Sequence, residues 1–330
     1  MPSGDLVVGV DVGGTSLFAA VVDTCNGKVL GKAKRKTKAE QGANGVVRRI
    51  VKTIRESIQE ADLDIKNLRG IGVGVPGPLD PEKGVVFRCV NLGESWTNFP
   101  LVEALQEYLP LPVVIENDVN AGAVGEHTYG AGRGSRDMLA IFVGTGIGGG
   151  LIIDGKLYPG VRHSAAEVGH MVILADGPLC SCGARGHAEA LASRSAIERD
   201  IRNALERGAD SIVPRLLRKY KRTSITSRII GEAYESGDKV TREAVRRAQY
   251  YLGLLVASCV NLLDPEMIVI GGGLLERMGE EYLVPVRRVF REHQVNKNSP
   301  FQPRVVRAEL GDFSGAMGAA VIAQRRLAQI

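Results

Sequence analysis

Cysteine is scarce in this sequence, and its five cysteines among 330 residues are too few, and odd in number, for a disulfide framework. Such a count is typical of a protein kept in a reducing compartment. The sequence also lacks any apolar stretch of the roughly 20 residues that a membrane-spanning helix needs. No basic segment and apolar stretch precede the first expected strand, Leu6 to Val10, so no signal peptide is indicated. We therefore expect a cytoplasmic protein without a membrane anchor.

A strong charge of one sign is missing as well, since the formal net charge is only +5. Nucleic-acid-binding proteins concentrate basic residues on one face, so we expect no nucleic-acid partner. The small excess favours anionic ligands such as nucleotides. The most basic run, Leu216 to Arg222, has helical apolar spacing and is interpreted as a solvated helix surface.

The composition is that of a folded protein, with 44% apolar and 24% charged residues. A chain of 330 residues is too long for one compact core, so two domains are expected. Helical apolar spacing predicts helices at Gly45 to Ala61, Leu101 to Leu109 and Val240 to Leu262.

Potential metal ligands gather between residues 167 and 189. Cys180 and Cys182 stand one residue apart, with His170 before them and His187 after them. Cysteine and histidine at such spacing, among glycine turns, favour a tetrahedral zinc site. Cysteines buried as small apolar residues are the alternative, and a disulfide is disfavoured by the reducing compartment.

Two acidic residues, Glu167 and Glu189, border this segment. They need not bind the metal. Held next to a rigid metal site, their carboxylates could bind hydroxyl groups of a substrate.

The N-terminal region predicts a β-meander with the sequence DVGGT at one hairpin tip. Apolar runs at Leu6 to Val10 and Leu17 to Val22 flank this turn. Glycine at the tip lets backbone N–H groups approach phosphate oxygens, and Asp11 is well placed to hold a hydrated Mg²⁺. An ordinary hairpin is the alternative.

A second glycine-rich turn, Gly144 to Gly150, follows the apolar run Leu139 to Val143. It matches the spacing G-x-G-x-x-G, but an apolar strand follows where the dinucleotide fingerprint needs a helix. It is therefore interpreted as another strand–turn–strand hairpin. Two such hairpins indicate a duplicated architecture, and they could grip one polyphosphate from two sides. A third run, Gly271 to Gly273, separates a strand from a helix and could let a base or ribose lie against the backbone.

Asp118 stands where the strand Val113 to Ile115 gives way to a helix that opens with small residues. One interpretation is a helix N-cap, for which Asp is favoured. The other is a general base at the carboxyl end of a strand, with Asn117 beside it as a ligand for a hydroxyl group. The loop Pro76 to Pro78 ends another strand and is either a ligand-site loop or a plain turn.

Eight motifs occur in one order along the chain: DVGGT, VGVPGP, ENDVNA, VGTGIGGG, EVGH, the Cys-x-Cys-Gly segment, IGGG and GDFSGAMGAA. Taken together, they resemble the ROK family of sugar kinases and sugar-responsive repressors, within the actin/hexokinase-like ATPase superfamily. The resemblance spans nearly the whole chain, and the stretch GVPGPLDPEKGVV followed by NLGESW looks most like ROK glucokinases.

The resemblance implies an α/β, two-lobed fold of the actin/hexokinase-like (ribonuclease H-like) class, with mixed sheets flanked by helices. The N-terminal lobe is expected at residues 1–118, with a C-terminal helix at about 312–330 packing back on it. The C-terminal lobe is expected at 119–311 and carries the zinc-binding loop 167–189. A homodimer or homotetramer is the expected assembly.

The resemblance also assigns roles to residues. Asp118 is implied as the catalytic base. Implied sugar ligands are Asn117, Asp118, Glu167, His170 and Glu189. Implied ligands of ATP and Mg²⁺ are Asp11, Gly13, Gly14, Thr15, Gly144, Thr145, Gly146, Gly148, Gly271, Gly272 and Gly273. Family zinc ligands correspond to His170, Cys180 and Cys182, and His187 is expected to complete a structural zinc site.

This chain departs from the family pattern at two positions. His187 stands where the family usually has a third cysteine; a His₂Cys₂ site stays chemically sound, although its zinc affinity and pH sensitivity could differ. Ala166 stands where a glycine commonly precedes the glutamate, which could shift the sugar loop.

The expected function is ATP-dependent phosphorylation of a hexose, with glucose to glucose 6-phosphate favoured. N-acetylmannosamine, N-acetylglucosamine, fructose and allose are alternative sugars, and polyphosphate is an alternative donor. A sugar-responsive repressor is a competing class, but its helix-turn-helix module would find no room before the first hairpin. An actin-like filament protein would not need the zinc segment or Glu189.

Overall fold

The computed structural model describes residues 5–89 and 92–329, so Asn91 of the NLGESW stretch lies outside the described residues. The chain divides into two compact units. The first contains Met1–Arg136, Gly150–Ala165 and Leu310–Ile330, and the second contains Asp137–Gly149 and Ala166–Glu309. No helix within 5–89 and 92–329 has the length and apolar character needed to cross a membrane.

A five-stranded sheet forms the centre of the first unit, in the order β3-β2-β1-β4-β7. Strands β1 to β3 form an antiparallel meander, and β4 and β7 extend it in parallel from β1. The bounds are β1 (Leu6–Val12), β2 (Ser16–Asp23), β3 (Lys28–Lys36), β4 (Gly70–Val75) and β7 (Val113–Asn117). A separate small hairpin consists of β5 (Leu79–Asp80) and β6 (Val85–Val86).

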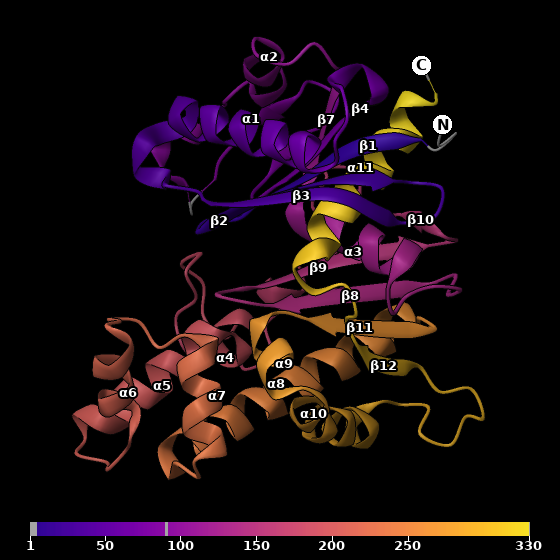
Figure 1. Cartoon of the computed structure of the whole chain (residues 1–330). Coiled ribbons are helices and arrows are strands. Elements are labelled where there is room, and N and C mark those ends of the chain that lie inside the picture. The colour runs from indigo at the N-terminus through magenta and orange to yellow at the C-terminus, as the bar shows by residue number, and fades with distance from the viewer. Residues whose placement is uncertain (1–4, 90–91, 330) are drawn as a thin grey trace. The chain divides into compact units, whose positions relative to one another are not determined.

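Side chains alternate between the two faces of this sheet, as the pleat of a strand requires. Val8, Val10 and Val12 pack in one core beneath α1 (Gly42–Glu60) and α2 (Leu101–Gln106), whereas Val7 packs on the opposite face. That opposite face is covered by α11 (Ser314–Leu327), which contacts β1, β4 and the helix α3 (Asp118–Tyr129). Figure 1 shows α1 on one side of these strands and the yellow helix α11 on the other.

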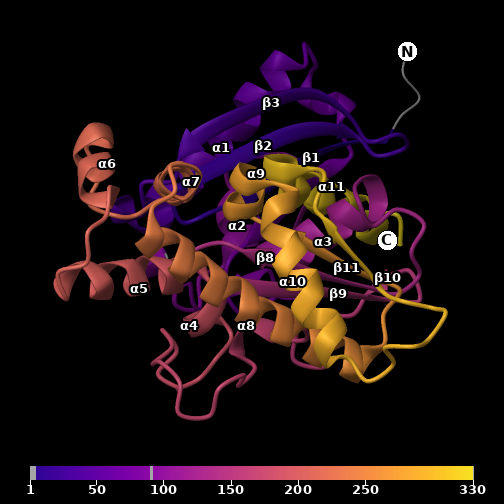
Figure 2. The same cartoon turned by 90° about the horizontal axis from the view of Figure 1, so that it is seen from below.

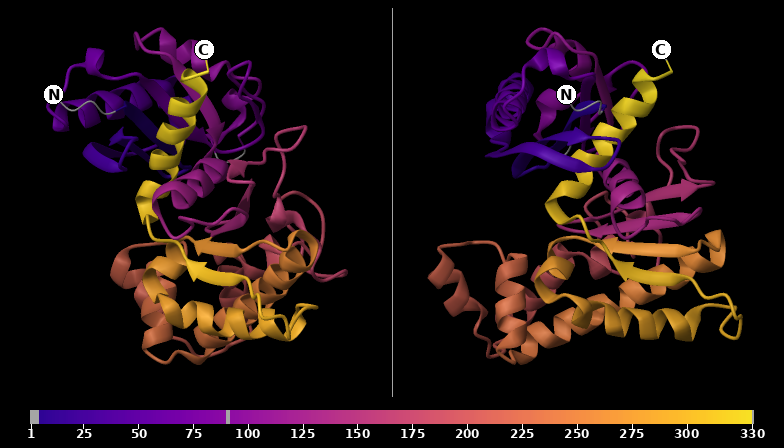
Figure 3. Two further views of the ribbon diagram at one scale, coloured as in Figure 1. Left: turned by 90° about the vertical axis from the view of Figure 1, so that its right-hand side faces the viewer. Right: turned by 45° about the vertical axis from the view of Figure 1, so that its right-hand side comes forward.

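Glycines allow α11 to approach the sheet and α3 so closely. A Cβ atom on Gly9 would lie 1.8 Å from the Ala316 carbonyl oxygen, and one on Gly318 would lie 1.7 Å from the Ala121 carbonyl oxygen. Both distances are far below any real contact, so backbone must meet backbone at these points. Figure 3 follows the yellow helix across the indigo and violet strands that it covers.

The second five-stranded sheet has the order β10-β9-β8-β11-β12. Its first three strands in sequence form a meander and its last two lie in parallel beyond β8, which is the order of the first sheet. This repeat confirms the duplicated architecture that the two glycine-rich hairpins predict. The bounds are β8 (Met138–Val143), β9 (Ile147–Ile153), β10 (Lys156–Leu157), β11 (Met267–Gly271) and β12 (Arg304–Arg307).

Helices make up most of the rest of the second unit. The longest, α8 (Lys239–Leu263), contacts α4, α5 and α10, and Figure 2 shows α8 and α10 side by side. The remaining helices are α4 (Glu189–Ala192), α5 (Arg194–Glu206), α6 (Val213–Tyr220), α7 (Ser227–Glu235), α9 (Gly273–Met278) and α10 (Glu280–His293).

The division of the chain differs from the expected boundary after residue 118. All of α3 belongs to the first unit, together with 150–165 and with the C-terminal residues from Leu310 onward. The reason is packing, because α3 lies against α11 through Gly125 and Gly318. Asp118 therefore begins a helix of the first unit and does not close that unit.

We predict that Gly318→Ala destabilises the protein by about 3 kcal/mol, because the new methyl group overlaps the Ala121 carbonyl oxygen. Alanine normally stabilises a helix by about 1 kcal/mol relative to glycine, so the expected sign is reversed. Chemical denaturation measures the change. Gly144→Ala is the control, because a Cβ atom there meets nothing within 4 Å. Equal stability of Gly318→Ala and the wild type would contradict the close packing of the two helices.

Candidate active site and metal centre

The turn between β1 and β2 is a tight hairpin that presents its tip to solvent. The Gly13 N–H donates to the Ser16 carbonyl at 2.9 Å, while Gly14 and Thr15 are exposed. Thr37, which follows β3, donates its hydroxyl to the Gly13 carbonyl at 2.5 Å and its N–H to the Thr15 carbonyl at 2.9 Å. Thr37 thus holds the turn in place. Its role was not predicted, because only strand pairing brings it to the turn.

Asp11 lies near the end of β1 among other carboxylates of the first unit. Burial, together with the nearby charges of Asp118 and Asp312, raises the pKa of Asp11 to about 7, although Lys34 acts in the opposite direction. Ionising a carboxyl group in such surroundings is unfavourable, and a bound cation stabilises the ionised form. The donor set therefore fits Mg²⁺, for which carboxylate oxygens are suitable ligands.

Asn117 and Asp118 lie where β7 ends and α3 begins. The Asn117 side chain accepts hydrogen bonds from the N–H groups of Val119 at 2.9 Å and Asn120 at 3.1 Å, so Asn117 is the N-cap. The capping interpretation of Asp118 is therefore wrong. Asp118 is the first helical residue, where the positive end of the helix dipole stabilises a carboxylate.

Hydrogen bonds to a buried carboxylate hold this junction in place. Glu116, which is 2% exposed, accepts hydrogen bonds from the Asn117 N–H at 2.9 Å and the Asn120 amide at 3.1 Å. Arg326 of α11 pairs with the other Glu116 oxygen at 2.7 Å and donates to the Ile115 carbonyl at 3.0 Å. The sequence did not reveal this pair, because its members stand 210 positions apart. The C-terminal helix thereby orients the segment that carries Asp118.

The turn between β8 and β9 is held by side chains of the second unit. The Gly144 N–H donates to the Gly146 carbonyl at 2.9 Å. Glu189 accepts from the Ile147 N–H at 3.1 Å, and a Cβ atom on Gly146 would lie 2.2 Å from the Glu189 carboxylate. The structure thus brings together this turn and Glu189, two features that the sequence predicted separately.

The glycines 271–273 join β11 to α9. Gly272 has φ +111°, and a Cβ atom there would lie 2.2 Å from the Val143 carbonyl oxygen at the end of β8. A Cβ atom on Gly271 would lie 2.8 Å from the Phe142 ring. Close packing therefore accounts for these two glycines, and their contact with an adenosine stays a prediction.

The loop that carries Glu167 and His170 packs against β9. A Cβ atom on Gly169 would lie 2.0 Å from the Ile147 carbonyl oxygen, so the loop backbone rests directly on the strand. Glu167 is exposed just before the short 3₁₀ turn Val168–His170. Ala166 has φ +60°, in the left-handed region that favours glycine. This explains physically why a glycine suits that position.

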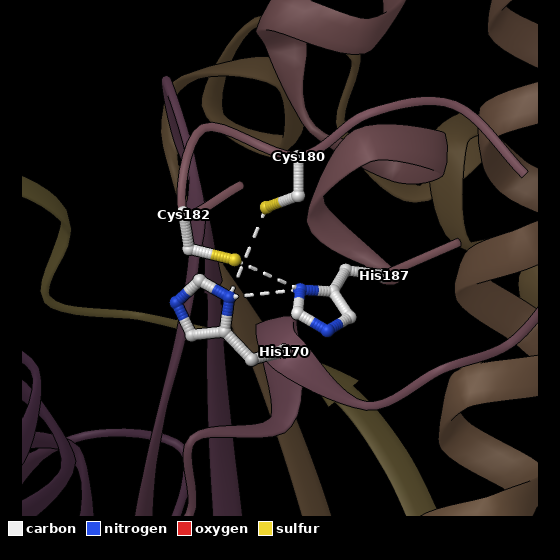
Figure 4. A group of neighbouring side chains, drawn as sticks. All are labelled: His170, Cys180, Cys182 and His187. Carbon is white, nitrogen blue, oxygen red and sulfur yellow. Dashed lines mark hydrogen bonds between the residues drawn. The ribbon is translucent and has the colours of Figure 1, made fainter. Parts of the chain in front are cut away.

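Four side chains converge at the base of this loop: His170, Cys180, Cys182 and His187 (Figure 4). The two histidine Nδ1 atoms lie 3.3 Å apart, the Cys182 sulfur lies 3.2 Å from Nδ1 of His187, and the Cys180 sulfur lies 3.8 Å from Nδ1 of His170. Two nitrogens bound tetrahedrally to zinc lie about 3.3 Å apart, and a nitrogen and a sulfur about 3.6 Å apart. The donor set and its spacing therefore fit one zinc ion.

Backbone hydrogen bonds preshape this cluster. The Cys180 N–H donates to the Ala184 carbonyl at 2.8 Å, and the Ala188 N–H donates to the Met171 carbonyl at 2.9 Å. Ser181 donates its hydroxyl to Glu189 at 2.9 Å, and the Cys180 thiol donates to the same carboxylate oxygen at 3.5 Å. The cluster is thus linked directly to Glu189 and, through Glu189, to the turn at Gly146.

We predict that Asp11→Asn stabilises the protein in Mg²⁺-free, nucleotide-free buffer by about 2 kcal/mol at pH 8, because it removes a buried, repelled carboxylate. The raised pKa means that the folded state holds the Asp11 proton more tightly than the unfolded state does. The contribution of Asp11 to wild-type stability should therefore decline as the pH rises from about 4 to about 7, with the loss complete above that range.

Chemical denaturation over this pH range measures the effect. Asp11→Asn should weaken the dependence of the free energy of unfolding on pH, whereas Glu82→Gln, at an exposed position, should leave this dependence unchanged. An identical pH dependence in Asp11→Asn and the wild type would show that Asp11 does not carry the effect.

Comparisons with known proteins agree with this architecture. The ROK family model matches residues 7–326. A glucokinase of Thermotoga maritima is 35% identical over 97% of this chain and 98% of its own length, and a xylose repressor of Caldicellulosiruptor bescii is 32% identical over 87% of this chain and 70% of its own length.

A solved structure leads to the same family. The ROK glucokinase of Streptomyces griseus, in complex with glucose and AMPPNP, matches with a TM-score of 0.84 and 34% identity over 97% of this chain and 99% of that chain. The expected actin/hexokinase-like fold class is thereby confirmed. A family match over nearly the whole chain, joined by similarity to ROK proteins in both sequence and structure, places this chain in the ROK family.

Proposed function

We propose that this chain is an ATP-dependent hexokinase that converts glucose to glucose 6-phosphate, with Asp118 as the general base. The observation that carries the proposal is the placement of Asp118. It is the first residue of α3, directly after the N-cap Asn117, and it lies near Asp11. The similarity to glucokinases, one of them with glucose and AMPPNP bound, supports glucose and ATP as the substrates.

The reaction is an in-line phosphoryl transfer. The glucose 6-hydroxyl oxygen forms a bond to the γ-phosphorus while the bond from that phosphorus to the β–γ bridging oxygen breaks, and the electron pair leaves with ADP. The hydroxyl proton passes to the Asp118 carboxylate. Asp11 would hold Mg²⁺, which supplies neutralisation of phosphate charge. Each glycine turn, 13–15 in the first unit and 144–148 in the second, would offer phosphate oxygens those backbone N–H groups that are not already bonded within the protein.

Each proposed sugar ligand retains a hydrogen-bonding group that a sugar hydroxyl could use. His170 directs Nδ1 into the metal cluster, so Nε2 remains for a sugar hydroxyl. Glu189 accepts from Ile147 and Ser181, and an ionised carboxylate has further lone pairs for a sugar. Asn117 uses its oxygen as a cap and retains amide donors, while Glu167 is exposed.

Zinc has a structural role in this proposal. His170, Cys180, Cys182 and His187 would hold the ion and thereby fix the loop that presents Glu167 and Glu189. Function in the cytoplasm is consistent with ATP as the phosphoryl donor. Contact of the turn 271–273 with adenosine and assembly as a homodimer or homotetramer stay predictions.

We predict that Asp118→Asn lowers kcat by about 10²–10⁴-fold, the usual contribution of a general base, while glucose binding stays largely intact. ADP release with MgATP measures this against glucose, mannose, fructose, N-acetylmannosamine, N-acetylglucosamine and no sugar. Asp62→Asn, at an exposed position, is the matched control. Wild-type turnover in Asp118→Asn would remove Asp118 from catalysis, and preference for an N-acetyl sugar would overturn glucose as the substrate.

We predict that Cys180→Ser and Cys182→Ser each lose bound zinc and raise the KM for glucose, because the loop carrying Glu167 and Glu189 is no longer fixed. Elemental analysis of the purified protein measures the metal. Cys25→Ser, at an exposed cysteine outside the cluster, should keep one zinc per chain. Zinc-free wild-type protein that is folded and phosphorylates glucose with an unchanged KM would refute the structural role.

A further inference from the structure

Arg194, the first residue of α5, packs beneath the turn between β8 and β9. Its Nη2 donates to the Thr145 hydroxyl oxygen at 2.8 Å, and its backbone N–H donates to the Gly144 carbonyl at 3.0 Å. The Arg194 side chain is 19% exposed, whereas Thr145 is exposed at the tip of the turn. One residue of α5 therefore contacts two consecutive residues of a proposed phosphate turn.

The guanidinium of Arg194 is held in one orientation from below. Its Nη1 donates to the Ile225 carbonyl at 3.1 Å and to Glu198 at 3.4 Å. Glu198 is itself fixed, because it accepts hydrogen bonds from the Ile225 N–H at 3.1 Å and from Arg202 at 2.6 Å. These contacts leave Nη2 aimed at Thr145.

The chemistry of the two groups then determines where the Thr145 proton points. A guanidinium only donates hydrogen bonds, so the Thr145 oxygen must accept from Arg194. The single hydroxyl proton of Thr145 is thereby directed away from Arg194 and is available to an acceptor outside the protein. A hydroxyl that has already been oriented loses less rotational freedom when it donates to a ligand.

The positive charge of Arg194 lies at Thr145 and favours an anionic acceptor there, while the Glu189 carboxylate contacts the turn at Ile147. Glu198 is the carboxylate that pairs with Arg194, and it also pairs with Arg202. Two guanidinium groups thus share one carboxylate, which leaves one positive charge in this group, and Arg194 is the member in contact with the turn. A phosphate oxygen at Thr145 would meet both an oriented O–H donor and this charge.

We propose that Arg194 is a positioning residue for the nucleotide: it orients the Thr145 hydroxyl as a hydrogen-bond donor to a phosphate oxygen of ATP. This inference rests on the proposed function, which brings nucleotide phosphates to the 144–148 turn. It adds a specificity determinant that the glycine motif does not contain, since the determinant lies on α5, 49 positions away from Thr145.

A double-mutant cycle on nucleotide binding tests the proposal. Arg194→Gln should raise the KM for ATP about 5- to 20-fold, because glutamine can accept as well as donate and no longer dictates the hydroxyl orientation. Thr145→Val should raise it to a similar extent. The double variant Arg194→Gln/Thr145→Val should be no worse than Thr145→Val alone, because the two residues act as one unit. Arg194→Lys, which keeps a pure donor, should recover part of the affinity.

Arg202→Gln is the matched control. It removes an arginine from the same Glu198, but Arg202 otherwise donates to Thr223 and has no hydrogen bond to the turn. The KM for ATP should rise less in this variant than in Arg194→Gln, because the local positive charge is lowered while the Thr145 hydroxyl stays oriented. The KM for glucose should stay the same in every variant. Thermal unfolding confirms that each variant is folded.

Three outcomes would overturn the inference: an unchanged KM for ATP in folded Arg194→Gln, multiplicative effects in the double variant, or an equal effect of Arg202→Gln. Failure of the proposed function looks different, because the wild type would then release no ADP with any sugar. Calorimetric titration of MgAMPPNP, which keeps all three phosphate groups, into the wild type and the same variants measures the coupling without turnover, and unchanged affinity in Arg194→Gln would refute the inference.

Discussion

The close approach of α11 to the first sheet and to α3 is the constraint on which the catalytic part of this protein depends. At Gly9, Gly72 and Gly318, a single methyl group would overlap a carbonyl oxygen at 2.0 Å or less. Such contacts admit only one alignment of the two helices over the strands. The last helix of the chain therefore determines where α3 starts, and with it the position of Asp118.

The same helix reaches the site through side chains as well. Arg326 ties α11 to the buried Glu116, and Gly315 lies so near Asp11 that a Cβ atom there would be 2.8 Å from the Asp11 carboxyl carbon. Burial of the Glu116 carboxylate is offset by this ion pair and by the hydrogen bonds that it accepts from Asn117 and Asn120, while Arg326 stays partly exposed. Glu116 thus has a structural task two positions before Asp118, the proposed general base.

The two sheets share one strand order but hold their first turns by different means. Thr37 anchors the first turn from the neighbouring strand. Glu189 and Arg194 anchor the second turn from α4 and α5, and Glu189 also connects it to the Cys/His cluster. Among the described residues, the Cys/His cluster accompanies the turn of the second sheet. Through Glu189, the proposed zinc ion would therefore influence the proposed phosphate turn as well as the proposed sugar loop.

The sequence by itself determined the features that depend on local chemistry. Glycine turns, apolar strands and closely spaced Cys and His ligands follow from neighbouring residues, and the order of the motifs identified the family. Tertiary structure alone decided that Asn117 caps α3 and that α3 belongs with α11. It also decided that Thr37 and Arg194 brace the two glycine turns and that Arg326 braces the end of β7. These contacts join residues far apart in the chain, and only the packing of strands and helices brings such residues within hydrogen-bonding distance.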